Sequence, residues 1–334
     1  MTMMEREGSR KKHFNQQKLI FVLLIVMFFG FTAIRPEFAS PRSIDNILRT
    51  LSMYGIASMG MTLVILTGGT DLSAGSVMAL SGVVGAGLLG NAISAANPVK
   101  LPFALTVAAA LTACGFIGLM NGLCIAKLKI APFVATLAMM SIARSLVYVT
   151  ADSVVQGVSG SPITFMDDGY SMLGQGHIGP VPVQLLLFLA VFLLLYAFLK
   201  YTRTGRAVYA VGGNQEIARL AGIKPMRVII LCYTLCGVLA GLSGLILVGR
   251  LSSASTVAAK GYELDFITAV ALGGTGMRGG SGGVAGTLLG VSFLAVMNNG
   301  LDMVNMPSFY QYLIKGTILV LAVYADKMLQ KEKN

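Results

Sequence analysis

Charged side chains inside apolar stretches are the residues of this sequence that could do chemistry. Asp71 stands in GGTDLSAGS, Arg144 in LAMMSIARSL, and Glu263 and Asp265 in KGYELDFITAV. An ionisable group in apolar surroundings is costly, so such groups are usually paired or functional. These carboxylates could coordinate a transported ion or carry a proton, or they could serve only structural or gating roles.

Each of these residues has two interpretations. Asp71 could bind an ion, but capping of the following helix through backbone N–H groups is favoured. Arg144 and either Glu263 or Asp265 could form an ion pair between two helices, which would lower the cost of burying both charges. Lys315 also stands within an apolar stretch and needs a partner that the sequence does not identify.

Catalytic, metal and nucleotide sites are not indicated. No Ser-His-Asp, Cys-His or paired-carboxylate set stands at a useful spacing, so we expect no catalytic residues, metal or cofactor. The four cysteines fall in apolar runs, where cysteine mostly packs as a small hydrophobe. The glycines of GTGMRG fit a dinucleotide-binding pattern, but a preceding strand and a later acidic residue are missing, so we expect no nucleotide site on this chain.

The composition indicates a membrane protein. Of 334 residues, 55% are hydrophobic and 12% are charged, whereas soluble domains carry about 25% charged residues. The net charge of +11 could suggest nucleic acid as a partner. The basic residues lie between apolar runs, however, so topology explains them better and no nucleic-acid partner is expected.

Helices must position these residues, since a bilayer core about 30 Å thick takes roughly 20 apolar residues as a helix. We predict an all-α integral membrane protein, a polytopic bundle of about ten transmembrane helices. The expected spans are 18–34, 44–66, 75–92, 101–126, 131–150, 182–199, 228–249, 264–274, 282–298 and 309–325. The eighth is short, and its ends are open. Many glycines lie within spans, which predicts closely packed helices.

Orientation follows from the basic residues, because cytoplasmic loops hold the excess of Lys and Arg. With the N-terminus inside, seventeen of the 25 basic residues fall on the cytoplasmic side. Both termini are then cytoplasmic, with tails at 1–17 and 327–334 around a transmembrane domain at 18–326. The longest external loop, 151–181, has no Lys or Arg and contains Asp152, Asp167 and Asp168.

One long polar segment, RTGRAVYAVGGNQEIARLAGIKPMR, interrupts the apolar chain on the cytoplasmic side. Within it, Asn214 is a good N-cap, Glu216 suits the first turn of a helix, and Gly222 suits a left-handed C-cap. These signals predict a helix of about two turns, too short to be stable alone. On these residues alone, a docking element and a solvated loop that only fixes topology are equally supported.

Two glycine-rich stretches, GGTDLSAGS from Gly68 and GGTGMRGGSGG from Gly273, resemble one another, and each joins two spans on the cytoplasmic side. Two halves related by duplication would explain this, as in many transporters.

The polar segment resembles the E-A-A-x-x-x-G motif of permease subunits of bacterial ATP-binding-cassette importers. TRTGRAVYAVGGNQEIARLAGI is similar to the version in monosaccharide permeases of the ribose, xylose and galactose type, with the strongest resemblance to the ribose type. Further matching runs are GMTLVILTGGTDLSAGS, APFVATLAMMSIARSL, GYELDFITAVALGGTGMRGGSGGVAGTLLG and SFYQYLIKGTILVLAVYAD. The resemblance covers about residues 18–326, and the order and spacing of the runs make it specific.

The resemblance implies a type II importer-like fold in a bacterial inner membrane and a transport subunit without enzymatic activity of its own. Segment 201–227 would contain the coupling helix that docks on a cytoplasmic ATPase. Its coupling residues would be Arg206, Asn214, Glu216, Ala218, Arg219 and Gly222.

Further partners implied by the resemblance are a periplasmic sugar-binding protein, delivering a monosaccharide near the 151–181 loop, and a second permease subunit, identical or paralogous. Arg278 departs from the smaller residues expected in its glycine-rich turn, and its role is open. Residues that bind the sugar are not identifiable from the sequence.

Two other functions remain open. An ion-gradient-driven secondary transporter would use Asp71, Glu263 or Asp265 as its coupling site, and uncoupling of the gradient would stop its uptake. A membrane scaffold would transport nothing and would leave the glycine-rich bundle unexplained.

Overall fold

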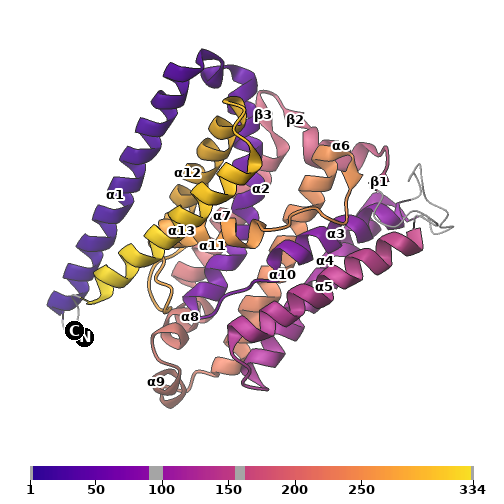
Figure 1. Cartoon of the computed structure of the whole chain (residues 1–334). Helices are drawn as coiled ribbons and strands as arrows, with labels where there is room; N and C mark the ends of the chain where they lie inside the picture. Colours follow the sequence, from indigo (N-terminus) through magenta and orange to yellow (C-terminus); the bar gives the residue numbers. More distant parts are fainter. Residues whose placement is uncertain (1–2, 90–100, 155–161, 332–334) are drawn as a thin grey trace.

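A computed structural model describes residues 3–89, 101–154 and 162–331 of the chain. These residues form long α-helices with a few two-residue strands, so the prediction of an all-α protein is confirmed (Figure 1). The long elements are α1 (Met3–Ile34), α2 (Pro41–Leu66), α3 (Ala74–Leu88), α4 (Phe103–Ala126), α5 (Pro132–Val154), α7 (Val183–Tyr201), α10 (Pro225–Leu251), α11 (Tyr262–Leu272), α12 (Val284–Met303) and α13 (Ser308–Lys331).

The short elements are a 3-10 helix η1 (Pro36–Ala39), α6 (Asp168–Gln175), α8 (Arg203–Gly213), α9 (Gln215–Leu220), β1 (Ile163–Thr164), β2 (His177–Ile178), β3 (Val181–Pro182) and β4 (Ser253–Ala254). Strand β1 pairs antiparallel with β4, and β2 pairs antiparallel with β3. The 151–181 segment, predicted as a loop, therefore contains regular structure. Its central part, 155–161, lies outside the described residues.

Within the described residues, seven helices are long and apolar enough to cross a membrane: α1, α2, α4, α5, α7, α10 and α12. This confirms a multi-pass helical membrane protein. The other three predicted spans coincide with α3, which is a shorter apolar helix, and with α11 and α13. The predicted tail boundaries at 17 and 327 fall inside α1 and α13, which continue as helices beyond their apolar parts.

Helix α10 forms the centre of the bundle and packs against α2, α3 and α4. Glycine allows the closest of these approaches. A Cβ on Gly118 of α4 would lie 2.3 Å from the carbonyl oxygen of Tyr233, and one on Gly122 would lie 2.7 Å from the Cα of Ile230. Backbones can approach this closely only where side chains are absent. The predicted close packing through glycines is thus confirmed for this pair of helices.

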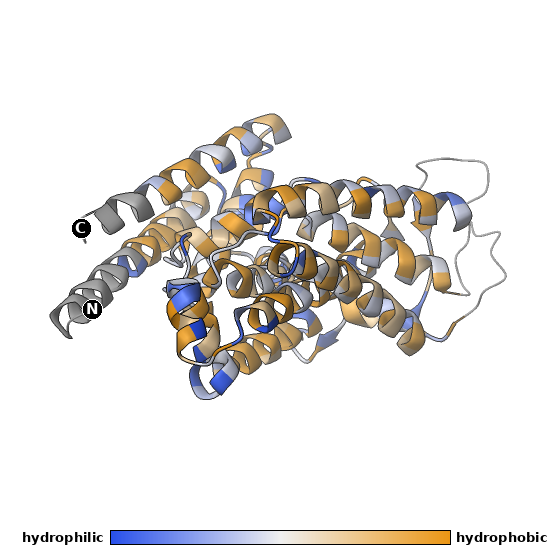
Figure 2. Cartoon of the chain, turned by 90° about the horizontal axis from the view of Figure 1, so that it is seen from below, coloured by the Kyte–Doolittle hydropathy of each residue, from blue (hydrophilic) through white to orange (hydrophobic). Residues whose placement is uncertain are grey.

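The bundle has two polar ends. Helices α8 and α9 lie at the bottom of Figure 1, whereas α6 and the strands lie at the top. The start of α1 and the end of α13 point to the lower left of that view. From below, hydrophobic residues dominate the long helices, while hydrophilic ones gather in short helices and turns (Figure 2).

Candidate coupling site

The polar segment forms two consecutive helices, α8 and α9, joined at Asn214. The Asn214 Oδ1 accepts hydrogen bonds from the backbone N–H groups of Glu216 (2.8 Å) and Ile217 (3.0 Å). The predicted N-cap is therefore confirmed. Helix α8 was not predicted. Thr202 was the overlooked signal, since its hydroxyl accepts from the N–H of Gly205 and caps α8.

Helix α9 ends at a left-handed glycine, as predicted. Gly222 has φ +81°, its N–H donates to the carbonyl of Arg219, and the N–H of Ile223 donates to that of Ala218. This is the Schellman arrangement, which satisfies the last carbonyls of a helix. A Cβ on Gly222 would meet nothing within 4 Å. Backbone conformation, and not lack of space, therefore requires glycine here.

Two apolar side chains of α9 face solvent at the tip of this end of the molecule. Ile217 is 65% exposed and Leu220 is 89% exposed, whereas Ala218 is buried. Glu216 and Arg219 are also exposed. The sequence singled out the polar motif residues and missed Ile217 and Leu220. Ile217 and Leu220 are therefore available for contact with a partner protein.

Helix α8 packs against the end of α2 and against the second glycine-rich stretch. A Cβ on Gly212 would lie 1.8 Å from the carbonyl oxygen of Leu66, which also accepts the N–H of Gly280 at 3.0 Å. The Tyr209 hydroxyl donates to the carbonyl of Gly282 at 3.1 Å. Burial raises the pKa of Tyr209, which favours the protonated, hydrogen-bond-donating phenol.

The two similar glycine-rich stretches thus meet at one place, with α8 beside them. The backbone of Gly68 also lies near the carbonyl of Arg278, whose side chain is exposed. Helix α8 thus contacts both the end of α2 and the turn between α11 and α12 through Gly212. Arg206, at the start of α8, donates to the carbonyl of Tyr201 at 3.4 Å.

Asp71 has internal partners. Its Oδ1 accepts from the backbone N–H (2.9 Å) and the hydroxyl (2.6 Å) of Ser73, the N-cap residue of α3, and from the amide of Asn121 (3.4 Å). The carboxylate is buried. The capping prediction was therefore partly correct. Asp71 is not the N-cap of α3, but it accepts hydrogen bonds from Ser73, the N-cap residue, in the turn before the helix.

Among the described residues, no direct ion pair joins Arg144 to Glu263 or Asp265, although the charges of Arg144 and Glu263 attract one another. The Arg144 Nη1 donates to the carbonyls of Thr256 and Ala258, both at 2.9 Å. These carbonyls belong to the connection before α11, and they supply the acceptors that a guanidinium needs. Asp265 instead pairs with Lys315, at 2.9 Å. The partner that the sequence could not identify for Lys315 is thus Asp265.

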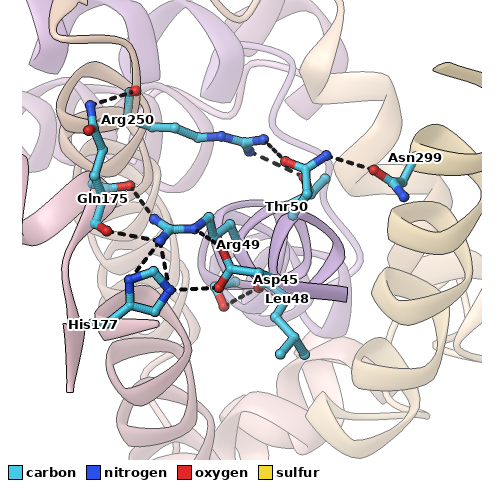
Figure 3. Close-up of polar contacts among 11 residues, drawn as sticks. Asp45, Leu48, Arg49, Thr50, Gln175, His177, Arg250 and Asn299 are labelled. Carbon is cyan, nitrogen blue, oxygen red and sulfur yellow. Dashed lines mark hydrogen bonds and ion pairs between the residues drawn. The ribbon is translucent and has the colours of Figure 1, made fainter. Parts of the chain in front are cut away.

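A polar network at the opposite end was also missed. Arg49 forms an ion pair with Asp45 at 2.7 Å and donates to the carbonyls of Gly174 (2.9 Å) and Gln175 (2.8 Å). His177 lies 2.9 Å from Asp45 (Figure 3). The network joins α2 to α6 and β2. The i, i+4 spacing of Asp45 and Arg49 was the available signal.

Arg250 extends this network to α10. It donates to the hydroxyl of Thr50 at 3.2 Å and to the amide oxygen of Asn46, and the amide of Asn46 contacts Asn299 of α12 (Figure 3). One hydrogen-bond network therefore joins helices α2, α10 and α12 to the 168–178 segment.

Comparison with known proteins agrees with this architecture. Residues 43–323 match the family described as "Branched-chain amino acid transport system / permease component". The chain is 39% identical to the ribose import permease protein of Bacillus subtilis (strain 168), covering 96% of each chain. It is 34% identical to the galactose/methyl galactoside import permease protein of Escherichia coli (strain K12), covering 94% of this chain and 95% of that one.

A third relative is the L-arabinose ABC transporter permease protein of Azospirillum brasilense, which is 33% identical over 94% of this chain and 88% of its own length. No solved structure gave a significant match.

Proposed function

The chain belongs to the family of branched-chain amino acid transport system permease components, and on that premise we propose that it is a permease subunit of an ATP-binding-cassette importer for a monosaccharide. Support for the substrate class comes from the relatives, which are permeases for ribose, L-arabinose and galactose. Ribose is the favoured sugar, because the ribose permeases share the higher identity.

The observation that carries the proposal is the position of α8 and α9. Their tip presents Ile217 and Leu220, and their base packs against the end of α2 at Leu66 and the second glycine-rich stretch at Gly280. An ATPase that binds the tip could move α8 and, through it, the helices on either side of both turns. Arg206, Asn214, Glu216, Ala218, Arg219 and Gly222 would be the coupling residues.

In this mechanism, ATP hydrolysis on the separate ATPase subunit supplies the free energy for transport. Closure of the ATPase dimer would move the coupling helices and shift the bundle from an inward-facing to an outward-facing state, a two-state change biased by differential contacts. The permease itself would have no enzymatic activity. Two permease subunits, identical or paralogous, would line one path.

The proposed topology has ten spans in the bacterial inner membrane, both termini cytoplasmic, and the polar segment 201–227 facing the ATPase. The 151–181 segment would be periplasmic and would face a sugar-binding protein. The placement of α8 and α9 at one end, and of α6 with the strands at the other, supports this assignment (Figure 1).

Sugar uptake tests the proposal. The chain is expressed with the ATPase and binding protein encoded in its source genome, in cells lacking other uptake systems for ribose, arabinose and galactose. We expect uptake of at least one sugar that continues when a protonophore collapses the proton gradient while ATP is maintained. Uptake that stops at once would instead support an ion-driven carrier, and no uptake of any of the three would contradict the proposal.

A further inference from the structure

A pocket of about 370 Å³ lies between the start of α8 and the start of α10, at the end of the bundle that is lowest in Figure 1. Its wall carries three basic side chains, those of Arg203, Lys224 and Arg227, and no acidic one among the described residues. The rest of the wall consists of Thr204, Ala207, Ile223, Val228 and Leu231. The pocket therefore combines a concentration of positive charge with an apolar floor.

The three cations of this pocket have no protein partner in the described part of the chain. None of their side chains takes part in an ion pair or a hydrogen bond there, and all three residues are exposed. Other cations are satisfied internally, as Arg49 is by Asp45 and Lys315 is by Asp265. Like charges around one hollow repel one another, so an anion held between them is electrostatically favourable.

The pocket lies next to the ends of two membrane spans. Arg203 is two residues beyond the span Val183–Tyr201, and Arg227 is the third residue of the span Pro225–Leu251. Tyr201 is 68% exposed, and tyrosine at the end of a span is typical of the membrane–water interface. Basic side chains near span ends extend towards this interface. The charges are thus at the depth of the lipid headgroups.

The floor of the pocket leads from these charges into the apolar part of α10. Val228 is buried and Leu231 is half-buried. Leu231 lies about 6 Å further along the helix axis than Arg227, because each helical residue rises about 1.5 Å. Leu235, one turn beyond Leu231 on the same face, is also half-buried. A ligand with a negative head and an apolar tail matches this order of charged rim and apolar wall.

We propose that the pocket binds an anionic phospholipid, with Arg203, Lys224 and Arg227 around the phosphate and an acyl chain along Leu231. Arginine donates paired hydrogen bonds to phosphate oxygens, and lysine adds a point charge. A soluble phosphate would leave the apolar floor in contact with water, so a lipid is the better match. In the proposed topology, this lipid belongs to the cytoplasmic leaflet.

The lipid site is separate from the proposed ATPase contact. Ile217 and Leu220 face solvent at the tip of α9, whereas no residue of α9 and none of the six coupling residues lines the pocket. A bound lipid would anchor the base of α8 to the bilayer surface beside α10. Lipid binding requires only that the chain lies in a membrane. Its test is therefore independent of transport, and its failure would leave the importer assignment unchanged.

Brominated lipids can test the site, because the chain contains no tryptophan and one introduced indole reports a single position. Met226→Trp places this reporter beside Arg227, since Met226 is 46% exposed and does not line the pocket. The full-length variant is reconstituted in phosphatidylcholine bilayers containing a small fraction of brominated phosphatidylglycerol or, in parallel, of brominated phosphatidylcholine. We expect the anionic lipid to quench the emission more strongly at equal mole fraction.

Removal of two of the charges should abolish this preference. Each basic side chain near an anionic lipid surface contributes roughly a fivefold factor, so we expect Arg203→Gln/Arg227→Gln to lower the relative affinity for phosphatidylglycerol about twenty-five-fold. The matched control, Lys127→Gln/Lys129→Gln, removes two exposed charges that lie outside the pocket and are assigned to the same side of the membrane. Its preference should equal that of the Met226→Trp parent.

A charge-preserving variant excludes misfolding as the cause of a loss. Arg203→Lys/Arg227→Lys should retain most of the preference, and thermal unfolding in detergent should be the same for all these variants. Equal quenching by the two brominated lipids would overturn the site. Equal losses in the glutamine variant and in its control would also overturn it, since diffuse positive charge would then explain the binding.

Two further measurements distinguish other occupants of the pocket. Displacement of brominated phosphatidylglycerol by sodium phosphate, but not by sodium chloride of equal ionic strength, would assign the pocket to soluble phosphate and overturn the lipid assignment. Loss of the co-purified ATPase from Arg203→Gln/Arg227→Gln, with the lipid preference retained, would assign the charges to the ATPase instead. We expect neither displacement by phosphate nor loss of the ATPase.

Discussion

The Nζ of Lys315 in α13 lies 2.9 Å from the Oδ2 of Asp265 in α11, and this ion pair ties the last long helix to the bundle. Both side chains are largely buried, at 17% and 4% exposed. In apolar surroundings, two charges that satisfy each other are far less costly than either charge alone.

Removal of one partner should therefore destabilise the protein strongly. We expect Lys315→Met or Asp265→Leu to lower the free energy of unfolding in detergent by about 3–5 kcal/mol for the charge left behind, and the double variant Asp265→Leu/Lys315→Met to recover most of this loss. Thermal unfolding of the purified variants measures it. Lys260→Met, an exposed lysine, is the control. Additive losses in the double variant would show that the pair contributes nothing.

The exposed apolar tip of α9 gives a prediction for partner binding. Leu220 is 89% exposed and contributes little to the fold of this chain. We expect Leu220→Asp to reduce co-purification of the ATPase by at least about tenfold, because a desolvated apolar anchor would carry a large share of such an interface. The thermal stability of the Leu220→Asp permease should match that of the wild type.

Leu128 provides a matched control for that experiment. It is 63% exposed in the turn between α4 and α5, which the proposed topology also places in the cytoplasm. Leu128→Asp should retain the ATPase. Equal retention by both variants would rule out the α9 tip as the docking element.

Local signals in the sequence predicted local structure well. Asn214 and Gly222 act within a few residues of themselves, so their types alone predicted the start and end of α9. The apolar runs predicted the long helices for the same reason. Helix α8 was missed, and the contacts of its Gly212 are with Leu66 and Gly280, which are distant in the sequence.

Pairing between distant residues could not be predicted. Arg144 was predicted to pair with Glu263 or Asp265. Its hydrogen bonds instead go to the backbone carbonyls of Thr256 and Ala258, although its charge and that of Glu263 still attract one another. A single sequence shows side-chain charge but not where an irregular connection presents its carbonyls.

The network around Arg49 gives a prediction for the α6 end of the molecule. Arg49 holds the carbonyls of Gly174 and Gln175 against α2. We expect Arg49→Ala to release this contact at a cost of about 1.5–3 kcal/mol, as for hydrogen bonds to a charged group. Hydrogen exchange of segment 168–178 should accelerate, while that of α9 should not change.

Arg42 is the control for that measurement, because it is an exposed arginine on the same helix. Arg42→Ala should leave exchange in segment 168–178 as in the wild type. If Arg49→Ala gives the same exchange pattern as Arg42→Ala, the network does not hold the segment in place.

Adjacent glycines in α8 allow the coupling path itself to be tested. A Cβ on Gly212 would lie 1.8 Å from the carbonyl oxygen of Leu66, whereas a Cβ on Gly213 would meet nothing within 4 Å. Alanine favours a helix over glycine by about 1 kcal/mol at either position, so the two variants differ mainly in this contact.

We expect Gly213→Ala to transport normally and Gly212→Ala to lose uptake by more than about tenfold, since even a small displacement at a coupling contact is costly. Both should still co-purify with the ATPase, because the α9 tip is untouched. Uptake and co-purification of the two variants are measured at equal protein level. Equal uptake by Gly212→Ala and Gly213→Ala would contradict transmission through α8.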